Sequence, residues 1–180
     1  MEYILATNFL NLNFSFSDEK SSYIRLGNWV NSNLSSGDSY EDKFRTHSGL
    51  NFIDQETQSI YILMLKTLTE ELNNYDERDF TYEEGMILYG PWLYHMISHY
   101  CYFYRLLKYV NNHNKDAILV CGDTNYESVF EDTLDHKKNI RYDVYNNQII
   151  KKIAGYIGIN LLLDDSHIHS EISSKYENHE

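Results

Sequence analysis

Short apolar runs alternate along this chain with longer segments of helical periodicity. The clearest run is 117–121 (Ala-Ile-Leu-Val-Cys), which predicts a buried strand. Residues 3–6, 23–26 and 159–163 predict three further strands. Because helical segments separate most of these strands, their order indicates an α/β fold. We therefore expect an α/β layer fold with a largely parallel sheet flanked by helices in a single domain.

A long amphipathic helix is predicted between the second and third strands. In 54–73, apolar residues recur three or four positions apart, which is the spacing of one helical face. Asp54 is the expected N-cap, and Asn73 marks the expected end. The preceding segment, 31–51, is rich in Asn, Ser, Gly and Asp, and this composition predicts a loop.

A second long helix is expected to begin after Thr81, because a threonine followed by acidic residues is a favourable helix start. This helix should run to about Val110. Pro91 falls inside it and removes a backbone donor, so we expect a break or kink there. Two shorter helices are predicted over 125–133 and 141–156.

Length and charge limit the classes of function. The chain has 180 residues, which suits one hydrophobic core. We expect one domain over 1–163, followed by a polar, flexible tail over 164–180. The net charge of −12 makes nucleic-acid binding unfavourable, because nucleic-acid phosphates are negative as well. An anionic ligand would need a locally positive spot, such as a helix N-terminus.

Neither a secretion signal nor a membrane span is expected. The first seven residues lack a basic region, and their apolar stretch is short. The most apolar long segment is 86–110, and charged or titratable side chains interrupt it. These features predict a cytoplasmic protein. Cys101 and Cys121 stand in apolar surroundings, so we expect both thiols to be buried and reduced.

Hydrogen-bonding residues follow three of the predicted strands. They are Thr7-Asn8, Gly27-Asn28-Trp29 and Gly122-Asp123-Thr124. Ligands of open α/β sheets bind beyond the carboxyl ends of the strands, where these residues should lie. Each group taken alone is more typical of a turn or a cap. Their joint occurrence favours a ligand site at this edge of the sheet.

His95 and His99 are four residues apart, so one face of a helix carries both. This is the spacing of a helical metal pair, but Met96 stands where the metalloprotease motif requires Glu. Histidines packed among the neighbouring aromatic residues are the favoured interpretation, and we expect no metal. An acid or base role for a histidine is the better functional alternative, because imidazole titrates near neutral pH. His167 and His169 lie in the polar tail, where solvated side chains are expected.

Aromatic residues are concentrated in the second long helix. Such side chains stack on sugars, but they fill cores more often. Because they recur all round the helix, some must face solvent or a partner. They are Trp92, Tyr94, Tyr100, Tyr102, Phe103 and Tyr104. The chain has no Walker loop, no dinucleotide-binding glycine motif and no serine-hydrolase elbow, so these enzyme classes have no support.

Three segments, taken in order, resemble a known family. Residues 25–30 (Arg-Leu-Gly-Asn-Trp-Val) are similar to a Leu-Gly-Glu-Trp-Cys motif. Residues 87–93 (Ile-Leu-Tyr-Gly-Pro-Trp-Leu) are similar to an Ile-Leu-Ile-Gly-Pro-Trp-Leu motif. Residues 142–150 form the third segment, and the opening strand resembles that of the same family. The family comprises transferases encoded in O-antigen and other surface-polysaccharide clusters.

This resemblance implies the N-terminal, acceptor-side domain of a GT-B-like glycosyltransferase. Such enzymes close two Rossmann-like domains over a donor and an acceptor, so this half alone should not transfer sugar. A sugar or glycan acceptor is then expected here, with the nucleotide-sugar donor on a C-terminal half and no cofactor in this chain. Substrate binding is expected from Asn28, Trp29, Trp92 and Asp123, and acid or base catalysis from His95.

The chain departs from the family pattern at two positions of the first motif. Asn28 replaces Glu and Val30 replaces Cys, and the lost Glu would have carried the charge that proton transfer needs. Residues 40–43 (Tyr-Glu-Asp-Lys) are only a remnant of the family's acidic stretch. A second hypothesis is therefore a stand-alone, non-catalytic module that binds a partner protein or a sugar. A third is a small metalloenzyme built on His95 and His99.

Overall fold

The computed structural model describes residues 2–6, 22–30, 39–46, 49–76, 79–122 and 143–164. The predicted helix over 125–133 and the predicted tail beyond Asp164 lie outside these residues. The chain divides into two compact units. We call Met1–Thr46 with Leu106–Glu180 the sheet unit, and His47–Arg105 the hairpin unit.

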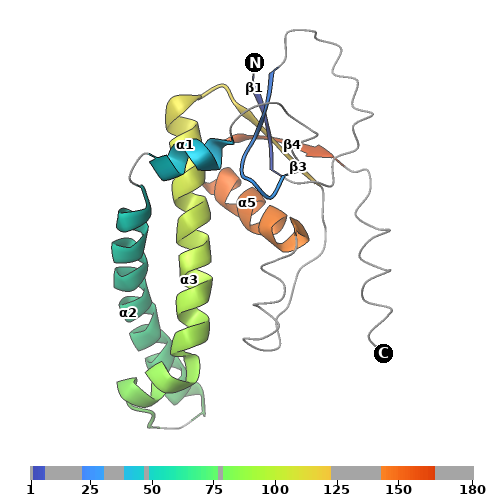
Figure 1. The fold of residues 1–180 in the computed structure, drawn as a ribbon. Helices are drawn as coiled ribbons and strands as arrows, with labels where there is room; N and C mark the ends of the chain where they lie inside the picture. Colours follow the sequence, from blue (N-terminus) through green and yellow to red (C-terminus); the bar gives the residue numbers. More distant parts are fainter. Residues whose placement is uncertain are drawn as a thin grey trace, which may run out of the picture. The chain divides into compact units, whose positions relative to one another are not determined.

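Four parallel strands form the centre of the sheet unit (Figure 1). They are β1 (Glu2–Leu5), β2 (Ser22–Arg25), β3 (Ile118–Gly122) and β4 (Asn160–Asp164), in the spatial order β2-β1-β3-β4. All three pairings are parallel, and each predicted strand is present within a residue of its expected position. The expected α/β class with a parallel sheet is confirmed, although most of the described structure is helical.

The strand register divides the apolar side chains between the two faces of the sheet. Leu5 pairs with Val120, and Val120 pairs with Leu162, so these three share one face. On this face Leu5 and Val120 form a small buried cluster with Val30. The opposite face carries Ile4 and Leu119, which are fully buried.

Helix α5 (Asp143–Ile157) packs against β3 and β4. Its buried apolar residues lie three or four apart, as expected of the core-facing side of an amphipathic helix. Gly158 ends the helix with a positive φ of 77°, and the Ile159 N–H donates to the Ala154 carbonyl at 3.0 Å. This is a Schellman cap, which glycine adopts without the steric cost of a Cβ atom.

The hairpin unit consists mainly of two antiparallel helices, α2 (Gly49–Asp76) and most of α3 (Tyr82–His113) (Figure 1). Their packing is close where α3 carries glycine. Gly85 lies against Thr69, and Gly90 lies against the Tyr61 hydroxyl. At the connection, the Asn73 side chain donates to the Phe80 carbonyl and accepts from its N–H, both at 2.8 Å. Glu56 and Arg105 form an ion pair between the two helices, with an N–O distance of 2.5 Å.

Two expectations about the helices are wrong. A short helix, α1 (Tyr40–Thr46), occupies part of the predicted loop, and α2 begins at Gly49, so Asp54 lies inside it rather than at its N-cap. Both helices begin within 31–51, where the polar composition predicted a loop. By contrast, Thr81 does cap α3, since its hydroxyl accepts from the Glu84 N–H at 3.2 Å.

Helix α3 continues through Pro91, so of the break or kink expected there, the break is absent. Proline removes one backbone donor, but buried contacts on either side, at Gly90 and Leu93, hold both halves against their neighbours. None of the described helices is long and apolar enough to cross a membrane.

Candidate functional site

The carboxyl ends of the four parallel strands lie at one edge of the sheet. From β1 the chain steps outward to β2 and later returns past β1 to β3, so the strand order reverses between β1 and β3. Open α/β sheets bind ligands at such a switch point. Described residues at this edge include Ala6 after β1, Gly27–Val30 after β2, Gly122 at the end of β3 and Asp164 at the end of β4.

A tight turn follows β2 and reaches back to β1. The Val30 N–H donates to the Gly27 carbonyl at 3.1 Å, which closes a four-residue β-turn. The Trp29 indole N–H donates to the Ala6 carbonyl at 3.0 Å. The indole ring passes so close to Gly27 that a Cβ atom there would overlap it. Glycine is therefore required for the approach of Trp29 to β1.

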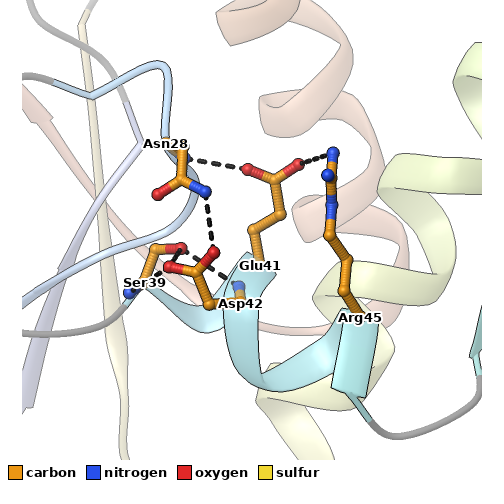
Figure 2. Close-up of polar contacts among 5 residues, drawn as sticks. All are labelled: Asn28, Ser39, Glu41, Asp42 and Arg45. Atoms are coloured by element: carbon orange, nitrogen blue, oxygen red, sulfur yellow. Dashed lines mark hydrogen bonds and ion pairs between the residues drawn. The ribbon is translucent and has the colours of Figure 1, made fainter.

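Helix α1 holds this turn from the other side (Figure 2). The Asn28 backbone N–H donates to Glu41 Oε2 at 2.9 Å, and Asn28 Nδ2 donates to Asp42 Oδ1 at 2.8 Å. The Glu41 N–H donates to the Leu26 carbonyl at 2.9 Å. Both hydrogen-bonding groups of Asn28 that face α1 are thus engaged, whereas its amide oxygen points away from the helix in Figure 2.

The two α1 carboxylates have structural partners. Ser39 and Asp42 form a capping box, in which the Asp42 N–H donates to Ser39 Oγ at 3.1 Å and the Ser39 N–H donates to Asp42 Oδ2 at 3.2 Å (Figure 2). The Ser39 hydroxyl also donates to Asp42 Oδ2, at 2.8 Å. The hydrogen bond from Asn28, followed by those from Ser39, lowers the pKa of Asp42. Glu41 is only 5% exposed and pairs with Arg45 at 2.7 Å. Two carboxylates are therefore held beside the turn.

Asn147 is a residue of this edge that the sequence analysis did not single out. It lies in α5, is 1% exposed, and donates from Nδ2 to the Gly122 carbonyl at 2.7 Å. Its amide oxygen has no hydrogen-bond partner among the described residues. The signal was present in the sequence, because an asparagine between Tyr145 and Ile149 occupies a core position of an apolar helix face.

The predicted site residues fall in different parts of the molecule. Asn28 and Trp29 lie at the carboxyl edge, next to one another in the turn. Asp123 directly follows Gly122 but lies outside the described residues. Trp92 and His95 belong to the hairpin unit, where Trp92 is half-buried and His95 is exposed with its ring 6.5 Å from that of Tyr94. The proposed roles of all five residues stay predictions.

The histidines of α3 contact aromatic rings. His99 meets Phe103 edge to face, with ring centroids 4.8 Å apart. Within the described ranges, no group of three or more histidine, cysteine or acidic side chains is placed to hold a metal ion. Cys101 and Cys121 are free and buried, as predicted, and burial raises the pKa of Cys121 to about 12.

No protein-family model, curated protein or solved structure matches this chain. The chain is a mixed α/β protein with a small parallel sheet, and a glycine-dependent turn and two engaged carboxylates lie at the carboxyl edge of that sheet.

Proposed function

We propose that this chain is the acceptor-side half of a GT-B-like glycosyltransferase that makes a surface polysaccharide in the cytoplasm. The observation that carries the proposal is the turn Gly27–Val30, which lies at the carboxyl edge and bonds through Trp29 to the end of β1, one of the two strands at the switch point. Residues 25–30 are also the first segment that resembles the transferase family. Support thus comes from two independent sources, the position of the turn and its sequence.

Asn28 and Trp29 offer the chemistry that a sugar acceptor needs. Asn28 is exposed, and its amide oxygen is directed away from α1, so it can accept a hydrogen bond from a sugar hydroxyl (Figure 2). Trp29 is half-buried and supplies an aromatic ring against which the apolar face of a sugar can pack. Asn28 cannot exchange a proton as a carboxylate does, so it is proposed to orient the acceptor.

In this proposal Asp123, which directly follows Gly122 in the sequence, binds the acceptor as well, and a C-terminal half binds the nucleotide-sugar donor. The substrate-binding role expected of Trp92 and the acid or base role expected of His95 stay predictions, because both residues belong to the hairpin unit. The hydrogen bonds that Asn28 donates to α1 support the positioning role of the turn, because they fix the Asn28 backbone and side chain independently. A group held at two points loses little further freedom when it binds a ligand. No transfer by this half alone is expected.

Calorimetric titration with short surface-polysaccharide oligosaccharides tests the proposal. We expect binding to the whole chain that weakens about tenfold or more in Asn28→Ala and in Trp29→Ala, a loss typical of central contact residues. Tyr156→Ala is the matched control, because it removes an exposed ring from the α5 end remote from Gly122. Equal affinity in all four proteins, or no heat with any oligosaccharide, would contradict the acceptor site.

A second candidate is a stand-alone binding module without catalysis. The large apolar side chains exposed on α2 and α3 favour it, because they are concentrated in the hairpin unit. This function predicts a stable oligomer or complex. Analytical ultracentrifugation and affinity purification check it, and a monomer that retains no partner would count against it.

A further inference from the structure

Six exposed apolar side chains occur in two runs of three consecutive residues. We call them the apolar band: Ile62, Leu63, Met64, Met86, Ile87 and Leu88. Consecutive helical residues project about 100° apart, so each run spreads around its helix and a single α2–α3 contact cannot cover all three members. The most exposed are Ile87 at 73%, Leu63 at 66% and Leu88 at 55%.

The two runs lie at similar levels of the hairpin. Thr69 of α2 lies against Gly85, and Tyr61 of α2 lies against Gly90. Residues 62–64 and 86–88 fall between these two contacts along their helices. The band therefore occupies one length of the hairpin, between these two contacts. Exposed apolar regions of this kind on a folded protein mark interaction sites.

Acidic side chains accompany the band. Between Ile62 and Leu88 the sequence has seven acidic and two basic residues, a net charge of −5. The acidic residues are Glu70, Glu71, Asp76, Glu77, Asp79, Glu83 and Glu84, and the basic ones are Lys66 and Arg78. Within the described residues, Glu70, Glu71, Glu83 and Glu84 are exposed on the two helices that carry the band.

We infer that the apolar band binds a partner protein through an amphipathic helix whose apolar face is flanked by lysine or arginine. The apolar side chains of the band would form the centre of the interface, and the glutamates would form its polar rim. A second copy of this chain would bring the same negative charge to the contact and be repelled. Anionic lipid surfaces would be repelled for the same reason.

The inference rests on the hairpin unit alone and goes beyond the acceptor site, which lies in the sheet unit. It gives a partner chemistry to the second candidate function. The acceptor-site proposal and the present inference can be refuted separately. A chain that binds no oligosaccharide could still bind a partner helix through the apolar band, and a chain that binds no helix could still bind oligosaccharide at the turn of Asn28.

Two synthetic helices of about four turns provide the probe. Both helices have leucine along one face. One helix carries lysine at all the remaining positions, and the other carries glutamate there. Fluorescence anisotropy with the whole chain should show binding of the lysine helix, with an affinity that falls as salt is raised, and no binding of the glutamate helix. Equal binding of both helices, or of neither, would overturn the inference.

Variants locate the binding surface. The double substitution Ile87→Gln with Leu88→Gln keeps good helix formers and should weaken the lysine helix about tenfold or more. Glu70→Gln with Glu71→Gln should reduce both the affinity and its salt dependence. Tyr156→Gln, which removes a side chain that is 84% exposed in the sheet unit, should change neither. Unchanged binding in the Ile87/Leu88 variant would overturn the inference.

Two further measurements test whether a second copy of this chain or a membrane occupies the apolar band instead. A dimer seen by analytical ultracentrifugation that dissociates in the Ile87/Leu88 variant would assign the band to a second copy. Cosedimentation with phosphatidylcholine vesicles that the same variant abolishes would assign it to a membrane. Either result would overturn the partner inferred above.

Discussion

At the scale of single residues, Asn28 is matched to the carboxylates around it. Its Nδ2 donates to Asp42 and its backbone N–H donates to Glu41, so two acceptors of α1 face two donors of the turn. A glutamate at this position, as in the resembled motif, would place a third carboxylate beside these two. Like charges at such separations repel, so an asparagine suits this position beside α1 better than a carboxylate would.

Asn28→Ala should raise the pKa of Asp42 towards its ordinary value, because it removes the largest cause of the lowering. A lowered folded-state pKa contributes stability above the unfolded-state pKa, and this contribution is lost as the pH falls through the folded-state pKa. The difference in free energy of unfolding between the wild type and the variant should therefore be larger at neutral pH than in strong acid. Carboxyl NMR titration measures the pKa, and an unchanged Asp42 titration would contradict the hydrogen bond.

Asn147→Ala should destabilise the sheet unit by about 1–3 kcal/mol, because the buried Gly122 carbonyl loses its donor. Asn147→Asp keeps the size of the side chain but places an acceptor against that carbonyl. It should therefore cost more than Asn147→Ala at neutral pH, and less once the introduced carboxyl is protonated. Urea denaturation at two pH values checks both, and a neutral effect of both changes would show that Asn147 does not hold β3.

At the scale of elements, glycines set the spacing of α2 and α3. Gly85 leaves room for Thr69, which is buried and whose hydroxyl donates to the Leu65 carbonyl at 2.8 Å. A threonine is stiff about χ1 and cannot turn aside easily. The hairpin therefore depends on a small residue where helix propensity alone would prefer alanine.

Gly85→Ala tests this packing through the sign of its effect. The added Cβ atom would overlap the Thr69 side chain, and such overpacking costs about 1–3 kcal/mol, against about 1 kcal/mol gained in helix propensity. We expect net destabilisation in the wild type and net stabilisation in a Thr69→Ala background. Thermal unfolding of the four proteins measures the cycle, and stabilisation in both backgrounds would contradict the contact.

Elements with a strong local sequence pattern were predicted, whereas α1, whose pattern is weak, was missed. The four strands and the cap at Thr81 were predictable, because apolar runs and capping residues act locally. The helix α1 was not predicted, although its capping box is visible as Ser39 and Asp42 three residues apart. Part of its stability comes from Glu41 and its contacts with the turn after β2, which are distant in sequence.

At the scale of the whole molecule, the division into two units could not be predicted from local patterns. The helices of the hairpin unit look like the crossover helices of an α/β layer, and only tertiary contacts separate them into their own unit. The same limit applies to the site. The strand ends indicated the carboxyl edge, but the partnership of Asn28 with α1 and of Asn147 with Gly122 depends on packing.

The central claim is that a glycan binds at the carboxyl edge of the sheet, and the Trp29 indole is its most direct reporter. Its N–H bonds to the Ala6 carbonyl, between the ends of β1 and β2. In a ¹H–¹⁵N NMR titration with surface-polysaccharide oligosaccharides, the account predicts that this indole signal and the Asn28 amide signals shift together and saturate. If the Trp29 indole signal and the Asn28 amide signals do not shift at saturating oligosaccharide, the account is contradicted.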